Sequence, residues 1–285
     1  MSVTLRISDA RLDELIAEDV PYIDLTSEVL GIGDAQGSIE YFTREACVLC
    51  CTEEVERIMG KLGLEMDWSL PSGTRLEAGQ AFLRAHGTAA QLHMAWKVCL
   101  NLFDHYSAVA TKADAMVRAA HAANPHCEVL ATRKSHPGIK DLLTKAVMTG
   151  GAYPHRLGLS ETVLVFDHHM KFMGGFDAFV EQLPAIRLRC IEKKLFVEAG
   201  AHQARVLARA GVDGIQFDKV PPAELSSLVG ELRAIDPHLT LIAAGGINPQ
   251  NAGEYAATGV DGLATTALFT AKPIDMSVRM NPLRS

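Results

Sequence analysis

The chain has 285 residues, of which 48% are hydrophobic and 21% are charged, and its formal net charge is -7. This composition predicts a globular protein with a substantial core, and the negative charge disfavours a general nucleic-acid binder. No apolar run approaches the roughly 18 residues that cross a bilayer, and the acidic N-terminal segment lacks the basic start and apolar core of a signal peptide. We therefore expect a cytoplasmic protein.

The first part of the chain mixes helical and strand patterns. Ser8 is predicted to cap a helix that runs through Leu12, Leu15 and Ile16, because these apolar side chains recur at helical spacing. Strands are expected next, followed by a long helix with a break near Ser107; the predicted strands are Gly37–Phe42, Ala46–Cys51 and Ala81–Ala85, and the predicted helix is Thr88–His121.

Three cysteines, Cys47, Cys50 and Cys51, form the one cluster of thiols in the sequence. A zinc site needs a second pair of ligands with similar spacing, and none follows. Because the same segment has the pattern of an apolar strand, and free cysteine is often buried, we predict structural cysteines.

From Cys127 onward, short apolar runs alternate with amphipathic segments. The runs are Glu128–Thr132, Thr162–Asp167, Lys194–Glu198, Gly214–Asp218, Leu239–Ala244 and Gly262–Thr265, with helical stretches such as Ala201–Ala210 and Ala223–Ile235 between them. Strands separated by single helices are typical of βαβ units and a parallel sheet. Six such strands favour a closed α/β barrel over an open sheet, although the residue pattern leaves closure open.

Cationic side chains follow the early strands of this predicted barrel. Arg133 and Lys134 stand directly after one apolar run, and His155 and Arg156 occur further on. Arginine binds carboxylate and phosphate groups in fork geometry, and lysine binds them as a point charge. Either segment taken alone is also compatible with a solvated loop.

Two carboxylates, Glu198 and Asp218, close successive strands. The carboxyl ends of parallel strands form the active-site face of α/β barrels, so the two groups are expected to lie close together. Paired carboxylates suit Mg²⁺, which one or two protein carboxylates hold together with substrate phosphates. Salt bridges to Lys194 or Lys219 are the alternative interpretation.

A glycine pair, Gly245 and Gly246, follows the strand that ends at Ala244. Glycine lets backbone N–H groups approach an anion, and the sequence predicts that a helix opens just afterwards. Thr266, after the last strand, is expected to complete a phosphate-binding cup, since late barrel strands often hold phosphate.

Several motifs resemble those of one enzyme family in order and spacing. They are TRKSHPG (Thr132–Gly138), GGAYPHRLGLSE (Gly150–Glu161), the strand that ends in Asp218, and AAGGIN (Ala243–Asn248). Together they resemble the nicotinate-nucleotide pyrophosphorylase (quinolinate phosphoribosyltransferase) family, over nearly the whole chain. Within it the chain looks most similar to the ModD group, encoded with molybdate-transport genes, through Ala95–Val98, His155–Thr162, Phe217–Lys219 and Asp275–Arg279.

The resemblance implies a type II phosphoribosyltransferase, a glycosyltransferase of the pentosyltransferase class. An N-terminal α/β sandwich of residues 1–108, completed by residues 274–285, would accompany an incomplete α/β barrel of residues 109–273 that carries the active site. The family forms homodimers with shared active sites, uses phosphoribosyl pyrophosphate (PRPP) with Mg²⁺, and needs neither nucleic acid nor membrane.

The same resemblance implies a role for individual residues. Lys134, Glu198 and Asp218 would be catalytic, and the two carboxylates would also face Mg²⁺ and the ribose. The remaining roles are substrate binding by Lys97, Arg133, His155, Arg156, Phe166 and His169, and phosphate binding by Gly245, Gly246 and Thr266.

Two positions depart from quinolinate chemistry. Lys97 stands where the family shows arginine, and Phe166 stands where it shows lysine. Losing one charge-assisted contact costs on the order of 1.5–3 kcal/mol. We therefore predict that PRPP remains the donor while the acceptor is an aromatic or heterocyclic acid other than quinolinate.

Three alternatives remain. The first is an ordinary decarboxylating quinolinate phosphoribosyltransferase that makes nicotinate mononucleotide. In that case His168 or His169, protonated beside the dicarboxylate, would replace the lysine that is missing at Phe166. A non-catalytic protein of molybdate transport could bind an oxyanion, although Glu198 and Asp218 would repel one unless a metal intervenes. An unrelated phosphate-binding barrel is the least specific interpretation.

Overall fold

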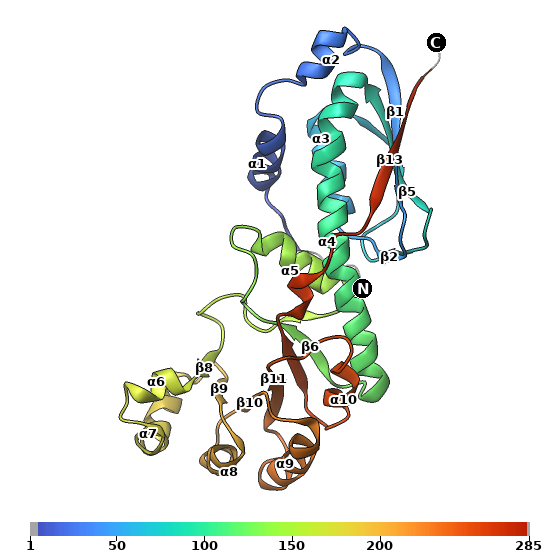
Figure 1. Cartoon of the computed structure of the whole chain (residues 1–285). Helices are drawn as coiled ribbons and strands as arrows, with labels where there is room; N and C mark the ends of the chain where they lie inside the picture. The colour runs from blue at the N-terminus through green and yellow to red at the C-terminus, as the bar shows by residue number, and fades with distance from the viewer. Residues whose placement is uncertain (1–4, 284–285) are drawn as a thin grey trace. The chain divides into compact units, whose positions relative to one another are not determined.

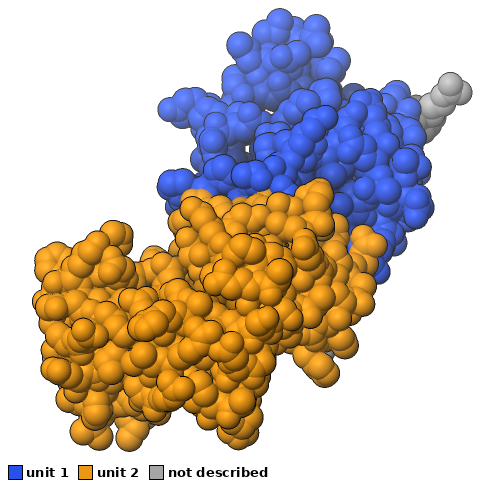
Figure 2. Space-filling view, turned by 60° about the horizontal axis from the view of Figure 1, so that its bottom comes forward, with its two compact units in different colours: residues 1–114, 136–151, 269–285 blue, residues 115–135, 152–268 orange. Residues whose placement is uncertain are grey.

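The computed structural model describes residues 5–283, and the chain divides into two compact units. Unit 1 comprises residues 1–114, 136–151 and 269–285, and unit 2 comprises residues 115–135 and 152–268 (Figure 2). The domains predicted from the sequence placed residues 109–273 in the barrel. In the structure, the segment 136–151 within that range groups with unit 1 instead.

Unit 1 contains an antiparallel sheet with the strand order β13-β1-β5-β3. The strands are β1 (Gln36–Thr43), β3 (Glu65–Ser69), β5 (Ala81–Thr88) and β13 (Met276–Pro282), while β2 (Cys47–Val48) pairs separately with β4 (Arg75–Leu76). The C-terminal strand therefore lies beside β1, from Gly37 opposite Pro282 to Thr43 opposite Met276 (Figure 1).

The helices of unit 1 are α1 (Asp9–Asp19), α2 (Leu25–Leu30), α3 (Thr52–Lys61), α5 (Lys140–Thr149) and the first part of α4 (Ala89–Ala123). Helix α3 contacts strand β3, and α1 contacts α3. Tyr41, Phe82 and Phe103 are fully buried, and the ring centroids of Phe82 and Phe103 lie 4.8 Å apart, edge to face. Such aromatic pairs stabilise a core beyond the area that they bury.

Local sequence patterns explain the helix boundaries of unit 1 in part. The Ser8 hydroxyl accepts the Arg11 N–H at 3.2 Å, which confirms the predicted cap of α1. The break expected near Ser107 is wrong, because α4 continues unbroken to Ala123. The Ser107 hydroxyl accepts the Cys50 N–H at 3.0 Å, so it contacts a neighbouring segment without opening the helix.

Unit 2 contains a seven-stranded parallel sheet in the order β7-β6-β12-β11-β10-β9-β8. Its strands are β6 (Glu128–Ala131), β7 (Tyr153–Pro154), β8 (Val163–Val165), β9 (Leu195–Glu198), β10 (Gly214–Asp218), β11 (Thr240–Ala244) and β12 (Gly262–Thr265). The closed barrel favoured by the residue pattern is wrong, because β7 and β8 are the two edges of this sheet. The incomplete barrel implied by the family resemblance is confirmed.

The shortness of the edge strands accounts for the open barrel. Strand β7 has two residues, and Pro154 lacks the N–H that a further neighbour would need. Strand β8 has three residues and pairs with β9 alone. Elsewhere the sheet connections are helical, through α6 (Asp167–Lys171), α7 (Phe176–Arg189), α8 (Ala201–Ala210), α9 (Pro222–Ile235) and α10 (Ala252–Ala256) (Figure 1).

The core of the half-barrel lies directly beneath its carboxyl-end rim. Leu164, Phe196, Ile242, Ala244 and Ala264 form one buried cluster, and Leu130 and Phe166 pack against it. Among the residues described, no helix is long and apolar enough to cross a membrane.

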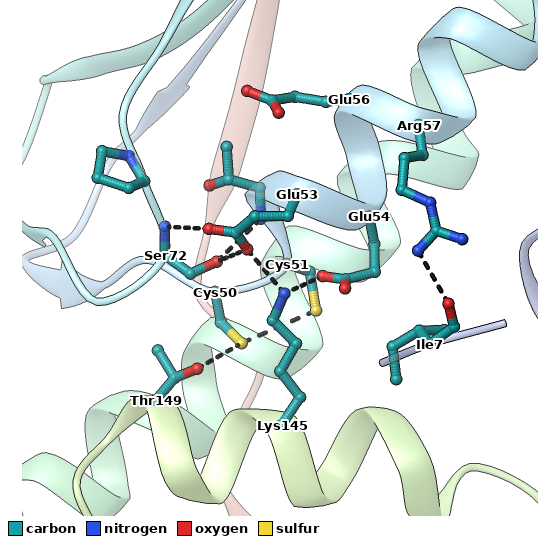
Figure 3. A network of polar contacts seen from close by, with 12 residues as sticks. Ile7, Cys50, Cys51, Glu53, Glu54, Glu56, Arg57, Ser72, Lys145 and Thr149 are labelled. Carbon is teal, nitrogen blue, oxygen red and sulfur yellow. Dashed lines mark hydrogen bonds and ion pairs between the residues drawn. The ribbon is translucent and has the colours of Figure 1, made fainter. Parts of the chain in front are cut away.

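The cysteine cluster lies in the interior of unit 1, and Cys47, Cys50 and Cys51 are all buried and unbridged, as predicted. Figure 3 shows Lys145 near Cys50 and Cys51. Lys145 Nζ contacts Glu53 at 2.7 Å and also pairs with Glu54. The side chains of Lys145 and Glu54 are 4% and 3% exposed, so each charge depends on the other to offset its loss of hydration.

Replacing Lys145 with methionine should therefore destabilise unit 1. Lys145→Met leaves the Glu54 carboxylate buried without a counter-charge, at a cost of about 3–5 kcal/mol. Chemical denaturation monitored by circular dichroism measures the effect. The control is Lys171→Met, which removes an exposed pair with Asp167 and should cost far less stability. The double variant Lys145→Met/Glu54→Leu should recover most of the lost stability. An equal loss in Lys145→Met and in Lys171→Met would contradict the prediction.

A second buried carboxyl, Asp104 on α4, should make stability depend on pH. Burial, together with the charge of nearby Asp275, raises its pKa from 3.8 to about 7, and one carboxyl oxygen has no hydrogen-bond partner in the described part of the chain. A raised carboxyl pKa means that the native state disfavours the charged form, so stability falls as the pH rises from about 4 to 7. Asp104→Asn should stabilise the protein by on the order of 1 kcal/mol at pH 8 and change little at pH 4. Thermal melts at both pH values measure this, and a stabilisation at pH 4 equal to that at pH 8 would refute it.

Candidate active site

A pocket of about 540 Å³ opens at the carboxyl ends of the parallel strands of unit 2. Residues after six of the strands line it, as the barrel prediction required. The lining consists of Thr132, Arg133, Lys134, His155, Arg156, Leu164, Phe166, Glu198, Gln216, Asp218, Lys219, Ala244, Gly245, Gly246, Ile247, Asn248, Ala264, Thr265, Thr266 and Ala267.

One part of the pocket is strongly cationic. Arg133 and Lys134 follow β6, Arg156 follows β7, and Lys219 follows β10. Among the residues described, none of these four cations has an acidic partner within 4 Å. Burial and the nearby Arg133 lower the pKa of Arg156, whose side chain is almost enclosed. An anionic ligand would relieve this accumulation of positive charge.

Two carboxylates face the same pocket. Glu198 ends β9 and Asp218 ends the neighbouring strand β10, so the parallel ladder brings them to one edge. Burial raises the pKa of Glu198, and repulsion from Asp218 raises it further, while a hydrogen bond from Gln216 lowers it. Neither carboxylate pairs with Lys194 or Lys219 in the described structure, so the salt-bridge interpretation is wrong.

The carboxylates offer a suitable but incomplete site for a divalent cation. No group of three or more His, Cys, Asp or Glu side chains that could hold a metal occurs among the described residues. Two carboxylates fit Mg²⁺, which commonly takes its remaining ligands from water and from substrate phosphates. The mutual repulsion of Glu198 and Asp218 would fall on binding such a cation.

The loop after β11 contributes two glycines, and so backbone atoms without side chains, to the pocket. Gly245 and Gly246 both have left-handed backbone angles, with φ of 84° and 77°. A side chain at Gly245 would clash with the Asp218 carboxylate and come within 2.5 Å of Lys219 Cγ, so only glycine fits beside Asp218. A helix follows this loop, as the sequence predicted, but α10 begins only at Ala252 and spans five residues.

Hydrogen bonds hold the rest of this rim. The side-chain amides of Asn248 and Asn251 each donate to the Gly246 carbonyl at 3.2 Å. Thr266, which was predicted to bind phosphate, lines the pocket, and its hydroxyl lies 2.7 Å from that of Thr132. The rim therefore combines fixed backbone with hydroxyl groups that can rotate to meet an anion.

The opposite part of the lining is apolar. Leu164 and Phe166 belong to β8 and its end, and Phe166 stacks on His169 with ring centroids 5.8 Å apart. His169 Nδ1 accepts the Phe166 N–H at 2.9 Å, so that nitrogen carries no proton, and His169 is not among the residues that line the pocket. His169 therefore orders the turn that presents Phe166.

Sequence comparisons agree with this geometry. The family model for the C-terminal domain of quinolinate phosphoribosyl transferase matches residues 109–279, and the model for its N-terminal domain matches residues 24–107. The chain belongs to the quinolinate phosphoribosyltransferase family. Its relatives are phosphoribosyltransferases of the pentosyltransferase class, and the chain is an enzyme of this type.

Individual relatives show the same pattern. ModD of Rhodobacter capsulatus is 41% identical over 247 residues, which cover 86% of this chain and 95% of ModD. Human nicotinate-nucleotide pyrophosphorylase (carboxylating) is 29% identical over 95% of this chain and 91% of its own length. The crystal structure of nicotinate-nucleotide pyrophosphorylase from Francisella tularensis superposes with a TM-score of 0.88 at 21% identity, covering 99% of this chain and all of that one, which supports the shared fold.

Of the twelve site residues assigned from the sequence and the family resemblance, ten line the pocket, and Lys97 and His169 do not. Lys97 lies on α4 in unit 1, where its ammonium group is 4.7 Å from the centre of the Trp96 ring, and it does not line the pocket of unit 2. Conversely, Gln216, Lys219 and Asn248 line the pocket and were missed. Gln216 had a visible signature, since it is the one uncharged polar residue inside the apolar run Gly214–Asp218.

The close fit of Gly245 against Asp218 can be tested by stability. Gly245→Ala and Gly246→Ala both place a side chain at a left-handed backbone angle, which costs about 1 kcal/mol in either case. Only Gly245→Ala adds a clash, because the space around Gly246 is open. Gly245→Ala should therefore lower the melting temperature clearly more than its neighbour does, and equal shifts would show that the contact is not needed.

Proposed function

We propose that this enzyme transfers the phosphoribosyl group of PRPP to an aromatic or heterocyclic acid other than quinolinate. The observation that carries the proposal is Phe166, an aromatic ring in the pocket lining at a position where the family resemblance implies a lysine. The residues expected to bind PRPP keep their charged groups, whereas the residues expected to bind the acceptor acid have lost one cation.

The donor half of the site would bind the sugar phosphate. The backbone at Gly245 and Gly246 and the Thr266 hydroxyl would hold the 5-phosphate at the rim, where fixed donors replace water. Glu198 and Asp218 would hold Mg²⁺, which when bound neutralises the charge of the pyrophosphate group.

The chemistry would be a displacement at C1 of the ribose. A nitrogen lone pair of the acceptor forms the new bond to C1 while the bond from C1 to the pyrophosphate oxygen breaks and its electrons leave with pyrophosphate. Positive charge develops on the sugar, and the carboxylates of Glu198 and Asp218 would stabilise it. Lys134 would stabilise the negative charge that builds on the leaving oxygen.

The acceptor half would bind a single carboxylate. Arg133 and Arg156 supply cations that have no ion-pair partner in the described part of the chain, and His155 lines the same pocket. A second carboxylate pressed against Leu164 and Phe166 would lose its hydration without gaining a partner. His169 Nδ1 accepts the Phe166 N–H, and His169 does not line the pocket.

We also propose a cytoplasmic homodimer with a role connected to molybdenum transport, as in the ModD group. The segment around α2 exposes large apolar side chains, with Tyr22 91%, Val29 76% and Leu25 64% exposed. Contiguous apolar surface of this kind is typical of protein interfaces. Lys97 does not line the pocket of its own subunit, so in a dimer it would be available to the pocket of a partner subunit.

An assay of pyrophosphate release tests the proposal. The enzyme is incubated with PRPP, Mg²⁺ and a panel of pyridine and other heterocyclic acids, with quinolinate included. Pyrophosphate release with a monoacid, and none with quinolinate, is the expected result. Release with quinolinate and CO₂ would identify an ordinary quinolinate enzyme, and failure of PRPP to bind in calorimetry, with molybdate bound instead, would identify a binding protein.

A substitution at Phe166 tests the reason for the changed acceptor. Phe166→Lys restores a cation and should tighten quinolinate binding by about one to two powers of ten, the value of a charge-assisted contact. Phe166→Leu is the matched apolar control and should leave quinolinate binding weak. Calorimetry with quinolinate measures both, and equal affinities would show that the ring does not exclude the second carboxylate.

A further inference from the structure

Lys219, the first residue after β10, has a backbone conformation that residues with a side chain rarely adopt. Its φ is 58°, and among the residues described Cys51 is the other non-glycine residue with a positive φ. The left-handed conformation destabilises the fold, because the Cβ atom approaches the following carbonyl oxygen. Non-glycine residues that keep such a conformation are concentrated at ligand sites, and Lys219 lines the pocket.

The stem of Lys219 lies against the glycine loop that follows β11. The Lys219 backbone N–H donates to the Ala244 carbonyl at 2.8 Å. A Cβ atom built at Gly245 would come within 2.5 Å of Lys219 Cγ. The absent side chain of Gly245 therefore leaves the space that the lysine stem occupies, and Lys219 and this loop form one part of the pocket wall.

The ammonium group of Lys219 is not used by the protein itself. Lys219 is exposed, and no carboxylate lies within 4 Å of its Nζ among the residues described. A solvated surface lysine would explain the exposure, but it would give no reason to keep a strained backbone beside the pocket. Lysine binds phosphate groups as a point charge, so an anionic ligand would explain both observations.

The glycine loop offers hydrogen-bond donors but no charge. In the described part of the chain, the N–H groups of Gly245 and Gly246 donate to no acceptor. The side-chain amides of Asn248 and Asn251 hold the Gly246 carbonyl, so the loop is fixed before a ligand binds. Helix α10 begins only at Ala252 and has five residues, so no helix dipole acts on the loop. A phosphate bound here would need a cation from a neighbouring segment.

We propose that Lys219 binds the 5-phosphate of the donor and supplies the positive charge that the glycine loop lacks. The inference rests on the proposed function, which identifies the donor as PRPP. Lys219 follows β10, which neighbours β11, whereas the other three cations follow β6 and β7, with β12 between these strands and β11. Arg133, Lys134 and Arg156 are then left for pyrophosphate and for the acceptor carboxylate.

Calorimetry with ribose 5-phosphate tests the assignment, because this probe has the 5-phosphate and lacks the pyrophosphate. Lys219→Met keeps most of the stem and removes the charge, and should raise the Kd about tenfold, the value of one charge-assisted contact. Lys219→Arg keeps the charge and should retain most of the affinity. The control is Lys193→Met, which removes an exposed cation before β9, at the opposite end of the strands, and should bind as the native enzyme does.

A glycine variant separates ligand binding from folding. Lys219→Gly removes the charge and also relieves the left-handed strain, so it should melt at a higher temperature than Lys219→Met while it binds ribose 5-phosphate as weakly. Higher stability with lower affinity is the result expected of a residue that is retained for its ligand. A Lys219→Gly variant that binds ribose 5-phosphate as tightly as the native enzyme would overturn the inference.

Kinetics test the consequence for turnover. The 5-phosphate lies away from C1, and its contacts stay the same as the bond at C1 breaks. Lys219→Met should therefore raise the KM for PRPP about tenfold and leave kcat nearly unchanged. Its affinity for pyrophosphate with Mg²⁺ should stay at the native value. A loss confined to pyrophosphate, or an unchanged KM for PRPP, would contradict the assignment of Lys219 to the 5-phosphate.

The outcomes separate the two proposals. If the native enzyme binds no PRPP, the proposed function fails and the role of Lys219 fails with it. If the native enzyme releases pyrophosphate while Lys219→Met and Lys219→Gly keep the native KM for PRPP, the proposed function stands and the role of Lys219 fails.

Discussion

The parallel pairing of β6, β12, β11, β10 and β9 is the constraint on which the site depends. Each strand of a parallel ladder ends at the same edge, so residues that are distant in the sequence meet there without any special contact between them. Arg133 after β6, Asp218 after β10 and Thr266 after β12 share one pocket for this reason. The apolar cluster beneath the rim, with Ile242 and Ala264 in it, fixes the strands at that edge.

The chemistry of the pocket follows from how its charges are divided. Cations gather after β6 and β7, and carboxylates gather after β9 and β10. Such a separation is unfavourable until a ligand with matching charges is bound, since neither group finds an ion-pair partner among the described residues. A substrate that carries phosphate on one side and a developing positive charge on its sugar would satisfy both groups.

The part of the pocket that would bind the acceptor acid is shaped by an apolar side chain and by polar side chains held in place by hydrogen bonds. Phe166 supplies an apolar wall, and His169 holds its backbone through the bond at Nδ1. Gln216 also lines the pocket, and its side-chain amide donates to the Glu198 carboxylate.

The sequence by itself determined the alternation of strands and helices and several exact boundaries such as Gly214–Asp218, because period is a local property. Strand-end position and the family resemblance together assigned twelve site residues, of which ten line the pocket. The tertiary structure alone decided that the barrel stays open, since closure depends on whether β7 and β8 are long enough to pair. It also decided that α4 passes Ser107 without a break and that α10 begins only at Ala252. Gln216 is visible in the sequence as a polar residue in an apolar run, but its hydrogen bond to Glu198 on the neighbouring strand is a tertiary contact that a local pattern does not reveal.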